Sequence, residues 1–259
     1  MSFAQSARPI EGAVATVGVS DRITFLRRTY AHLGGALIAW AALTAIILKF
    51  MTPTSLKFSA WALNGRWNWL MVIGLFMVVG WIAERLARSE TSRAVQYLGL
   101  GVEVLAWSIL LQPMIWMVMF KFGGDAGREL IMSGQLSMSS LAGRVIGESV
   151  VITLAIFIGL TVTVFVTKKD FSFMRSVLVL CTFAALGVII ASMIFGFHLG
   201  AIFSGLMILL MGGYILYQTS SIMRDFPPTA YVAAALMLFS TVATLFWYVL
   251  RLVMSLRSE

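Results

Sequence analysis

Long apolar stretches separated by short polar segments run along most of the chain. Seven are long enough to cross a bilayer, because about 20 residues at 1.5 Å rise span its ~30 Å hydrocarbon layer. The pattern therefore predicts an all-α integral membrane protein, a bundle of seven transmembrane helices. We expect a polar N-terminal segment at 1–29, the membrane domain at 30–254 and a C-terminal tail at 255–259. The expected spans are about 30–50, 69–86, 94–120, 145–167, 174–195, 199–223 and 229–254.

A polar stripe interrupts the last apolar stretch. Thr241, Thr244, Tyr248 and Arg251 follow one another at spacings of three, four and three, so they lie on one face of a helix. Lipid offers no hydrogen bonds, so this face should point toward other helices or water. We therefore expect the last helix at the centre of the bundle. The alternative, that each hydroxyl bonds only its own backbone carbonyls, stays open.

Two segments and one residue interrupt the apolar pattern elsewhere. Pro113, which follows Gln112, predicts a kink in the third span because proline lacks a backbone N–H. The Trp-rich segment 51–68 predicts a loop at the membrane interface. The segment 121–144, rich in glycine and serine, predicts an irregular or interfacial connection.

Small residues recur every four positions along the fourth span. They are Gly143, Gly147, Val151, Ala155 and Gly159. Such a face lets helix backbones approach closely, so we expect it to pack against a neighbouring helix.

Composition supports the membrane class and limits the partners. Sixty per cent of the 259 residues are hydrophobic, 12 per cent are charged, and the mean hydropathy is +0.93. A soluble domain carries roughly twice that charged fraction. The net charge of +8 lies in short loops, where topology explains it, so we expect membrane lipids and no nucleic acid as partners. Eleven Lys and Arg residues on the N-terminal side, against eight on the other, favour a cytoplasmic N-terminus.

Few ionisable residues lie at membrane depth. Glu103, about one third into the third span, is the least expected, because a lone buried carboxylate is costly. It is either an ion or proton site or a neutral acid bonded to a neighbouring helix. Glu84, Arg85 and Glu148 lie near the ends of spans and are expected to be interfacial anchors or loop ion pairs.

No residue pattern indicates an enzyme or a bound metal. His32 and His198 have no partner at metal-ligand spacing, so we expect no metal or cofactor. The sequence has no H-E-x-x-H motif, and no histidine follows Ser204 to act as its base. We therefore interpret the chain as a non-enzyme.

Three stretches carry a resemblance to a known family. They read FLRRTYAHLGG (25–35), LAIFIGLTVTVFVTKKDFSFM (154–174), and SGLMILLMGGYILYQTSSI (204–222) with AALMLFSTVATLFWYVLRL (234–252). In this order they resemble the Bax inhibitor-1 (transmembrane Bax-inhibitor-motif) family. The DFPP link before the last helix is similar to its bacterial, YccA-like branch.

This resemblance implies a seven-helix bundle with the last helix in the middle and a cytoplasmic N-terminus, in a bacterial inner membrane. Its members are described as pH-sensitive calcium leak channels, or as modulators of partners that include a membrane-anchored AAA protease. The resemblance therefore implies one of two functions for this chain. One is a leak pathway for calcium or another cation, and the other is a non-conducting regulator of such a protease or of a stress response.

The residues of the implied site depart from the family pattern. The two titrating aspartates of the leak members match Gln218 and Thr241, and the following asparagine matches Thr244. Without this aspartate pair we expect a flux that is nearly flat between about pH 6 and about pH 8, with Glu103 as the remaining candidate pH sensor. Arg85 matches the family's arginine and should bond a backbone carbonyl, Gln218 or Glu148. The implied ion-pathway or pH-sensing residues are Gln218, Thr241, Arg85, Glu103, Glu148 and Thr244.

Overall fold

The computed structural model describes residues 13–16, 18–89, 92–133 and 139–257. Parts of the expected N-terminal segment (1–12 and 17) and of the expected tail (258–259) lie outside these residues. Within them every regular element is a helix, and seven helical segments are long and apolar enough to cross a membrane. These are α1 (Val19–Phe50), α3 (Arg66–Ala87), α4 (Arg93–Leu110) continued by α5 (Gln112–Phe122), α7 (Ser140–Thr167), α8 (Arg175–Phe195) preceded by η2 (Ser172–Met174), α9 (Ala201–Arg224) and α10 (Tyr231–Leu256). The expected fold class is confirmed.

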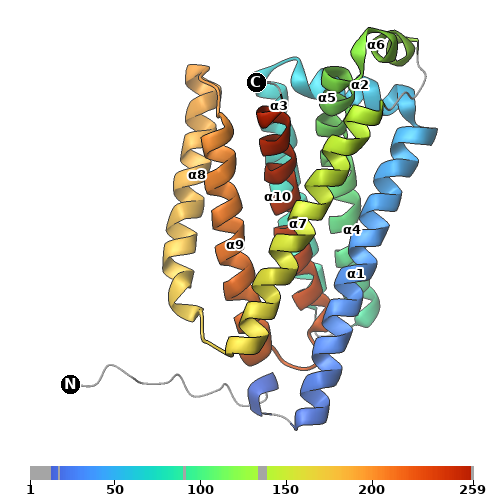
Figure 1. Ribbon diagram of the computed structural model, residues 1–259. Coiled ribbons are helices and arrows are strands. Elements are labelled where there is room, and N and C mark those ends of the chain that lie inside the picture. The colour runs from blue at the N-terminus through green and yellow to red at the C-terminus, as the bar shows by residue number, and fades with distance from the viewer. Residues whose placement is uncertain (1–12, 17, 90–91, 134–138, 258–259) are drawn as a thin grey trace.

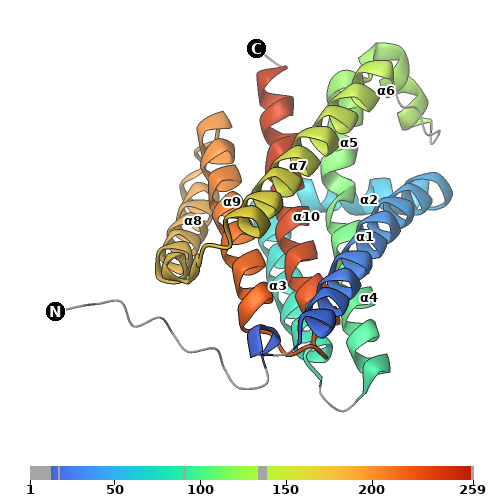
Figure 2. The same ribbon diagram turned by 60° about the horizontal axis from the view of Figure 1, so that its bottom comes forward.

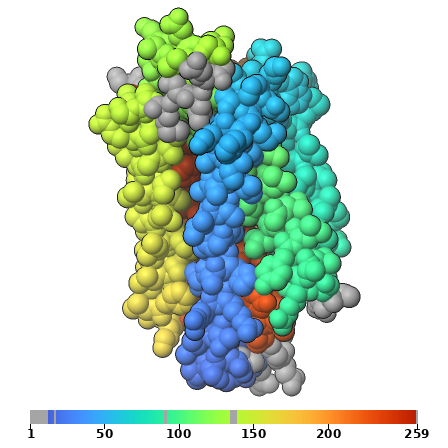
Figure 3. Space-filling model, turned by 90° about the vertical axis from the view of Figure 1, so that its right-hand side faces the viewer, coloured from blue at the N-terminus to red at the C-terminus, as the bar shows by residue number. Residues whose placement is uncertain are grey.

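The last helix, α10, lies at the centre of the bundle. It packs against α1, α3, α4, α7 and α9 (Figures 1 and 2). In its most apolar stretch 78 per cent of the residues are buried, against 6 per cent for the peripheral α8. Figure 3 shows α10 in red only through narrow gaps beside α1. The N-terminal end of α1 and the C-terminal end of α10 lie at opposite ends of the molecule (Figure 1).

Helix α1 begins at Val19, about three turns before the expected start of the first span. Its 32 residues give a length of about 48 Å, longer than the hydrocarbon layer. Phe25, Thr29 and Leu33 are buried at every fourth position, so the polar first part of the helix still has a packed face. Hydropathy detects only the part of a helix that lies in lipid, and for that reason it missed this extension.

The expected kink at Pro113 is present as a break between α4 and α5. Gln112 and Pro113 open α5, and the Gln112 side chain is buried. Gln112 Oε1 accepts a hydrogen bond from Ser55 Oγ (2.8 Å), and Ser55 Oγ accepts one from Trp116 Nε1 (2.8 Å). Gln112 Nε2 donates to the Ser108 carbonyl at 2.9 Å. These bonds hold α2 (Thr52–Leu63) against the break.

Two segments contain short helices, which corrects the expectation of a loop at 51–68 and of an irregular connection at 121–144. Within 51–68 the chain forms α2, with Pro53 in its first turn, where a missing N–H costs nothing. Within 121–144 it forms α6 (Gly124–Met132), and α7 already begins at Ser140; residues 134–138 lie outside the described part. Both short helices lie at one end of the bundle (Figure 1).

The small-residue face expected to pack on the fourth span points outward instead. Gly147, Val151, Ala155 and Gly159 are exposed, and a Cβ added at Gly147 or Gly159 would meet no described atom within 4 Å. The packed face of α7 is shifted by two residues, to the other side of the helix. Its buried residues are Ala142, Val145, Ser149, Thr153, Phe157, Thr161 and Val164.

Candidate functional site

The two positions matched to the family's aspartates touch each other. Gln218 on α9 and Thr241 on α10 are each 7 per cent exposed. Thr241 Oγ1 donates to Gln218 Oε1 at 2.9 Å, and the same hydroxyl lies 3.2 Å from the Met237 carbonyl. The pair is a neutral hydrogen bond that joins the neighbouring helices α9 and α10.

Glu103 lies on the other side of α10. It belongs to α4 and is 4 per cent exposed. Its Oε1 accepts hydrogen bonds from Trp107 Nε1 (3.1 Å) and from Ser240 Oγ of α10 (2.5 Å). Its Oε2 is buried with no hydrogen-bond partner among the described residues. Gly80 of α3 leaves room there, since a Cβ at Gly80 would lie 3.5 Å from Oε2. Glu103 is therefore bonded to α10 through Oε1, whereas Oε2 has no hydrogen-bond partner among the described residues.

These side chains form a polar seam, which we define as Glu103, Ser240, Thr241 and Gln218. Ser240 and Thr241 are consecutive on α10, so the seam crosses this helix from α4 to α9. Thr244 is half-buried and donates to the Ser240 carbonyl at 2.7 Å. Thr244 therefore bonds a backbone carbonyl of its own helix, as the alternative interpretation of the polar stripe expected. The seam places carboxylate, hydroxyl and amide oxygens at the centre of an otherwise apolar bundle.

The end of the polar stripe on α10 also faces protein. Tyr248 packs edge-on against Phe203 of α9, with ring centroids 6.0 Å apart. Arg251 Nη2 donates to the carbonyl of Leu199, in the turn between α8 and α9, at 2.5 Å. The stripe therefore points toward α9 and its preceding turn, as the sequence pattern indicates.

Arg85 does not join the seam, and its expected hydrogen bond is wrong. The side chain is exposed, and its guanidinium lies 4.8 Å from the centroid of the Trp81 ring. Across the part of the chain that the structure covers, it makes no hydrogen bond or ion pair. The cause is the rotation of α3, which buries Ala83 and Ala87 and turns the residue midway between them outward.

Two of the other expected anchors form ion pairs. Glu84 Oε1 lies 2.8 Å from Arg88 Nη2, one turn further along α3. Glu148 Oε2 accepts from Arg257 Nε at 3.1 Å, which ties the start of α7 to the C-terminal end of α10. Both pairs are largely exposed, so each stabilises the fold by about 0.2–1 kcal/mol.

A charged cluster lies at the end of the bundle where α1 begins, and it was not predicted as a site from the sequence. Arg224, the last residue of α9, pairs with Asp170 and Asp225 and donates to Ser172 Oγ. Burial, which raises the pKa of Asp170, is outweighed by hydrogen bonds from Ser172 and by the Arg224 guanidinium, so that pKa lies below its ordinary value. The sequence signal was the pair of motifs KKDFSF and RDFPP, which place opposite charges at the ends of neighbouring helices.

Within the described ranges, the histidines and acids are not grouped as metal ligands. Among the described residues no group of three His, Cys, Asp or Glu side chains is placed to hold an ion. His32 Nε2 lies 3.0 Å from the Tyr97 hydroxyl, and His32 Nδ1 lies 2.7 Å from the Arg28 carbonyl. Its partners are thus protein groups on α1 and α4.

Comparisons with known proteins give the family. The family model described as "Inhibitor of apoptosis-promoting Bax1" matches residues 22–258. The chain is 25 per cent identical to Bax inhibitor 1 of Schizosaccharomyces pombe over 251 residues, which cover 95 per cent of this chain and 82 per cent of that protein. It is 33 per cent identical over 107 residues to an uncharacterized membrane protein of Vibrio cholerae, covering 39 per cent of this chain and 46 per cent of that one. No solved structure matches the chain. The resemblance to the family as a whole is thereby confirmed, and the chain belongs to the Bax inhibitor-1 family of membrane proteins.

Proposed function

We propose that the chain is a leak pathway for cations, with calcium as the ion to test first, and that the ion passes along the polar seam. The observation that carries this proposal is Glu103. It lies at the bundle centre with one carboxylate oxygen unpartnered among the described residues. Carboxylate, amide and hydroxyl oxygens are the ligands that hard cations prefer, and the seam offers all three.

The side chains of the seam are bonded to one another in this conformation. Its hydroxyls and its amide oxygen bond one another or Glu103, and the two cavities described in this structure lie elsewhere. One lies between α2, α5 and α6, and the other lies near the cluster around Arg224. Conduction therefore requires α9 and α10 to separate far enough to break the bond between Gln218 and Thr241.

The test is calcium flux into liposomes that contain the purified chain. We expect flux above that of protein-free liposomes, and a several-fold loss for Glu103→Gln. Glutamine keeps an oxygen that accepts from Ser240 and Trp107 but removes the carboxyl group, so the fold should survive. The matched control is Glu84→Gln, an exposed glutamate of α3, which should leave flux unchanged. Equal flux for Glu103→Gln and the native chain would overturn the proposal.

A second candidate function, the non-conducting regulator, rests on a different observation. Gly147, Val151, Ala155 and Gly159 form a row of small exposed residues on α7. Such a row permits close approach by a helix of another membrane protein, for which a membrane-anchored protease is the candidate. Flux no higher than in protein-free liposomes, together with loss of crosslinking to such a protease on Gly147→Leu, would favour this function.

A further inference from the structure

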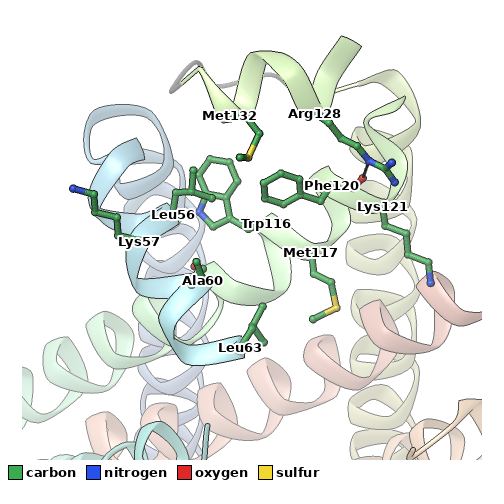
Figure 4. A pocket seen from close by; sticks show the side chains of 11 residues that line it. Leu56, Lys57, Ala60, Leu63, Trp116, Met117, Phe120, Lys121, Arg128 and Met132 are labelled. Carbon is green, nitrogen blue, oxygen red and sulfur yellow. Dashed lines mark hydrogen bonds between the residues drawn. The ribbon is translucent and has the colours of Figure 1, made fainter. Parts of the chain in front are cut away.

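A cavity of about 710 Å³ lies at the end of the bundle opposite the N-terminal end of α1. It is formed by α2, α5 and α6, and its volume falls within the range of about 300–1,000 Å³ usual for ligand pockets. Figure 4 shows the apolar side chains of Leu56, Trp116, Phe120 and Met132 gathered around one space. Ala60, Leu63 and Met117 complete the apolar wall. The interior therefore suits a hydrocarbon group.

The cavity lies where the bilayer meets water. Helices α2 and α6 have 12 and 9 residues, which gives about 18 and about 14 Å, too short to cross the hydrocarbon layer. Trp61 on α2 and Trp67 at the start of α3 are exposed beside it, as is typical of residues at the level of the lipid head groups. A molecule in this cavity would have its polar end among the head groups.

The rim of the cavity is positive. Lys57, Lys121 and Arg128 are among its lining residues, and no carboxylate is. In Figure 4 the side-chain amines of Lys57 and Lys121 lie at opposite edges of the cavity and point away from its apolar interior. The Arg128 Nε donates to the Phe120 carbonyl at 2.9 Å, and its Nη1 is 3.8 Å from the fully exposed Asp125. The positive charge on both edges thus favours a negative group at the mouth of the cavity over a neutral one.

One polar group in the wall has no partner. Ser59 lines the cavity, is 1 per cent exposed, and its Oγ makes no hydrogen bond with any described residue. A buried hydroxyl without a partner costs about 1–3 kcal/mol. The Ser59 Oγ has under 1 Å² of accessible surface, so it lies behind the wall, and a molecule in the cavity meets mainly apolar atoms there.

We propose that this cavity binds an anionic phospholipid. One acyl chain fills the space between α2 and α5, and the phosphate lies at the mouth of the cavity, within the positive field of Lys57, Lys121 and Arg128. An amphiphile with one negative group matches the apolar wall and the positive rim together. A peptide or a second copy of the chain would need more polar partners than the wall provides.

The test is native mass spectrometry of the full-length chain in detergent, with phosphatidylglycerol and phosphatidylcholine at equal concentration. We expect retention of phosphatidylglycerol several-fold above that of phosphatidylcholine. Lys57→Gln with Lys121→Gln should abolish this preference, because the rim loses two charges. Ala60→Phe should lower retention of both lipids several-fold, because the ring fills the cavity. Lys49→Gln, at the same end of the molecule on α1, is the control and should change nothing.

The substituted side chains are exposed, so the variants should fold, and their melting temperatures check this. Met117 also lines the cavity, so Met117→Trp replaces Ala60→Phe if Ala60→Phe is unstable. Unchanged lipid retention in both the charge and the filling variants would overturn the proposal. So would a mass of two chains that the filling variant reduces to one, because a second copy would then occupy the cavity.

Discussion

At the scale of single residues, helix rotation decides which polar side chains reach the centre of the molecule. Glu103 was predicted from its depth in an apolar stretch and Gln218 from its match to a family position, and both are buried beside α10. Arg85 was matched to a family position by its place in the sequence, yet it faces outward. Depth along a helix can be read from hydropathy, whereas the direction of a side chain depends on packing that the local sequence does not fix.

Asp170 gives a pH dependence of stability that can be measured. Its folded-state pKa lies below the unfolded value of about 3.9, so its stabilising effect is present above about pH 4 and is lost as pH falls through the folded-state pKa. We expect Asp170→Asn to lower the melting temperature in detergent at pH 7, and the difference from the native chain to shrink toward pH 3.

The control for this prediction is Asp125→Asn. Asp125 is fully exposed and 3.8 Å from Arg128, so its loss should change the melting temperature little at either pH. A difference for Asp170→Asn that is equal at pH 7 and pH 3 would show that the ion pair with Arg224 is not its cause.

At the scale of elements, all seven spans were predicted, but two short helices and one packing face were not. Helices α2 and α6 lack a long apolar run, so nothing in hydropathy separates them from loops. On α7 two rows of residues repeat every four positions, one through Gly147 and one through Ser149. The sequence alone favoured the row of small residues, while the tertiary contacts selected the other. The break at Pro113 was predictable because proline removes a backbone donor.

The hydrogen bonds of Gln112 lead to a prediction about how α2 is held. Gln112→Leu leaves the buried hydroxyl of Ser55 without its acceptor, which should destabilise the fold by about 1–3 kcal/mol. Thermal unfolding in detergent measures this loss. Ser108→Ala, one turn earlier, removes only a bond to its own backbone and should cost less. Equal losses for the two variants would mean that the contact with Ser55 does not anchor α2.

At the scale of the whole molecule, the arrangement leads to a prediction of topology. The turn that carries Lys168 and Lys169 lies at the same end as the start of α1, and the end of α10 lies at the other (Figure 1). We predict that a reporter inserted at Lys169 lies in the cytoplasm and that one fused after Glu259 lies outside. Reporters that give the same side would contradict seven spans, and exchanged sides would contradict a cytoplasmic N-terminus.

We propose that cations pass along the seam and that this chain lacks the pH gate that a pair of aspartates would provide. Two adjacent carboxylates cannot both ionise cheaply, so a pair of aspartates changes its protonation near neutral pH, whereas Gln218 and Thr241 have no proton to exchange there. The decisive measurement is calcium flux into liposomes between about pH 6 and about pH 8. It compares the native chain, the double variant Gln218→Asp with Thr241→Asp, and the neutral control Gln218→Asn with Thr241→Ser. We predict nearly flat flux for the native chain and the control, and a several-fold change with pH for the double variant. A folded double variant whose flux is as flat as that of the native chain would contradict the proposal that an aspartate pair at these positions makes cation flux depend on pH.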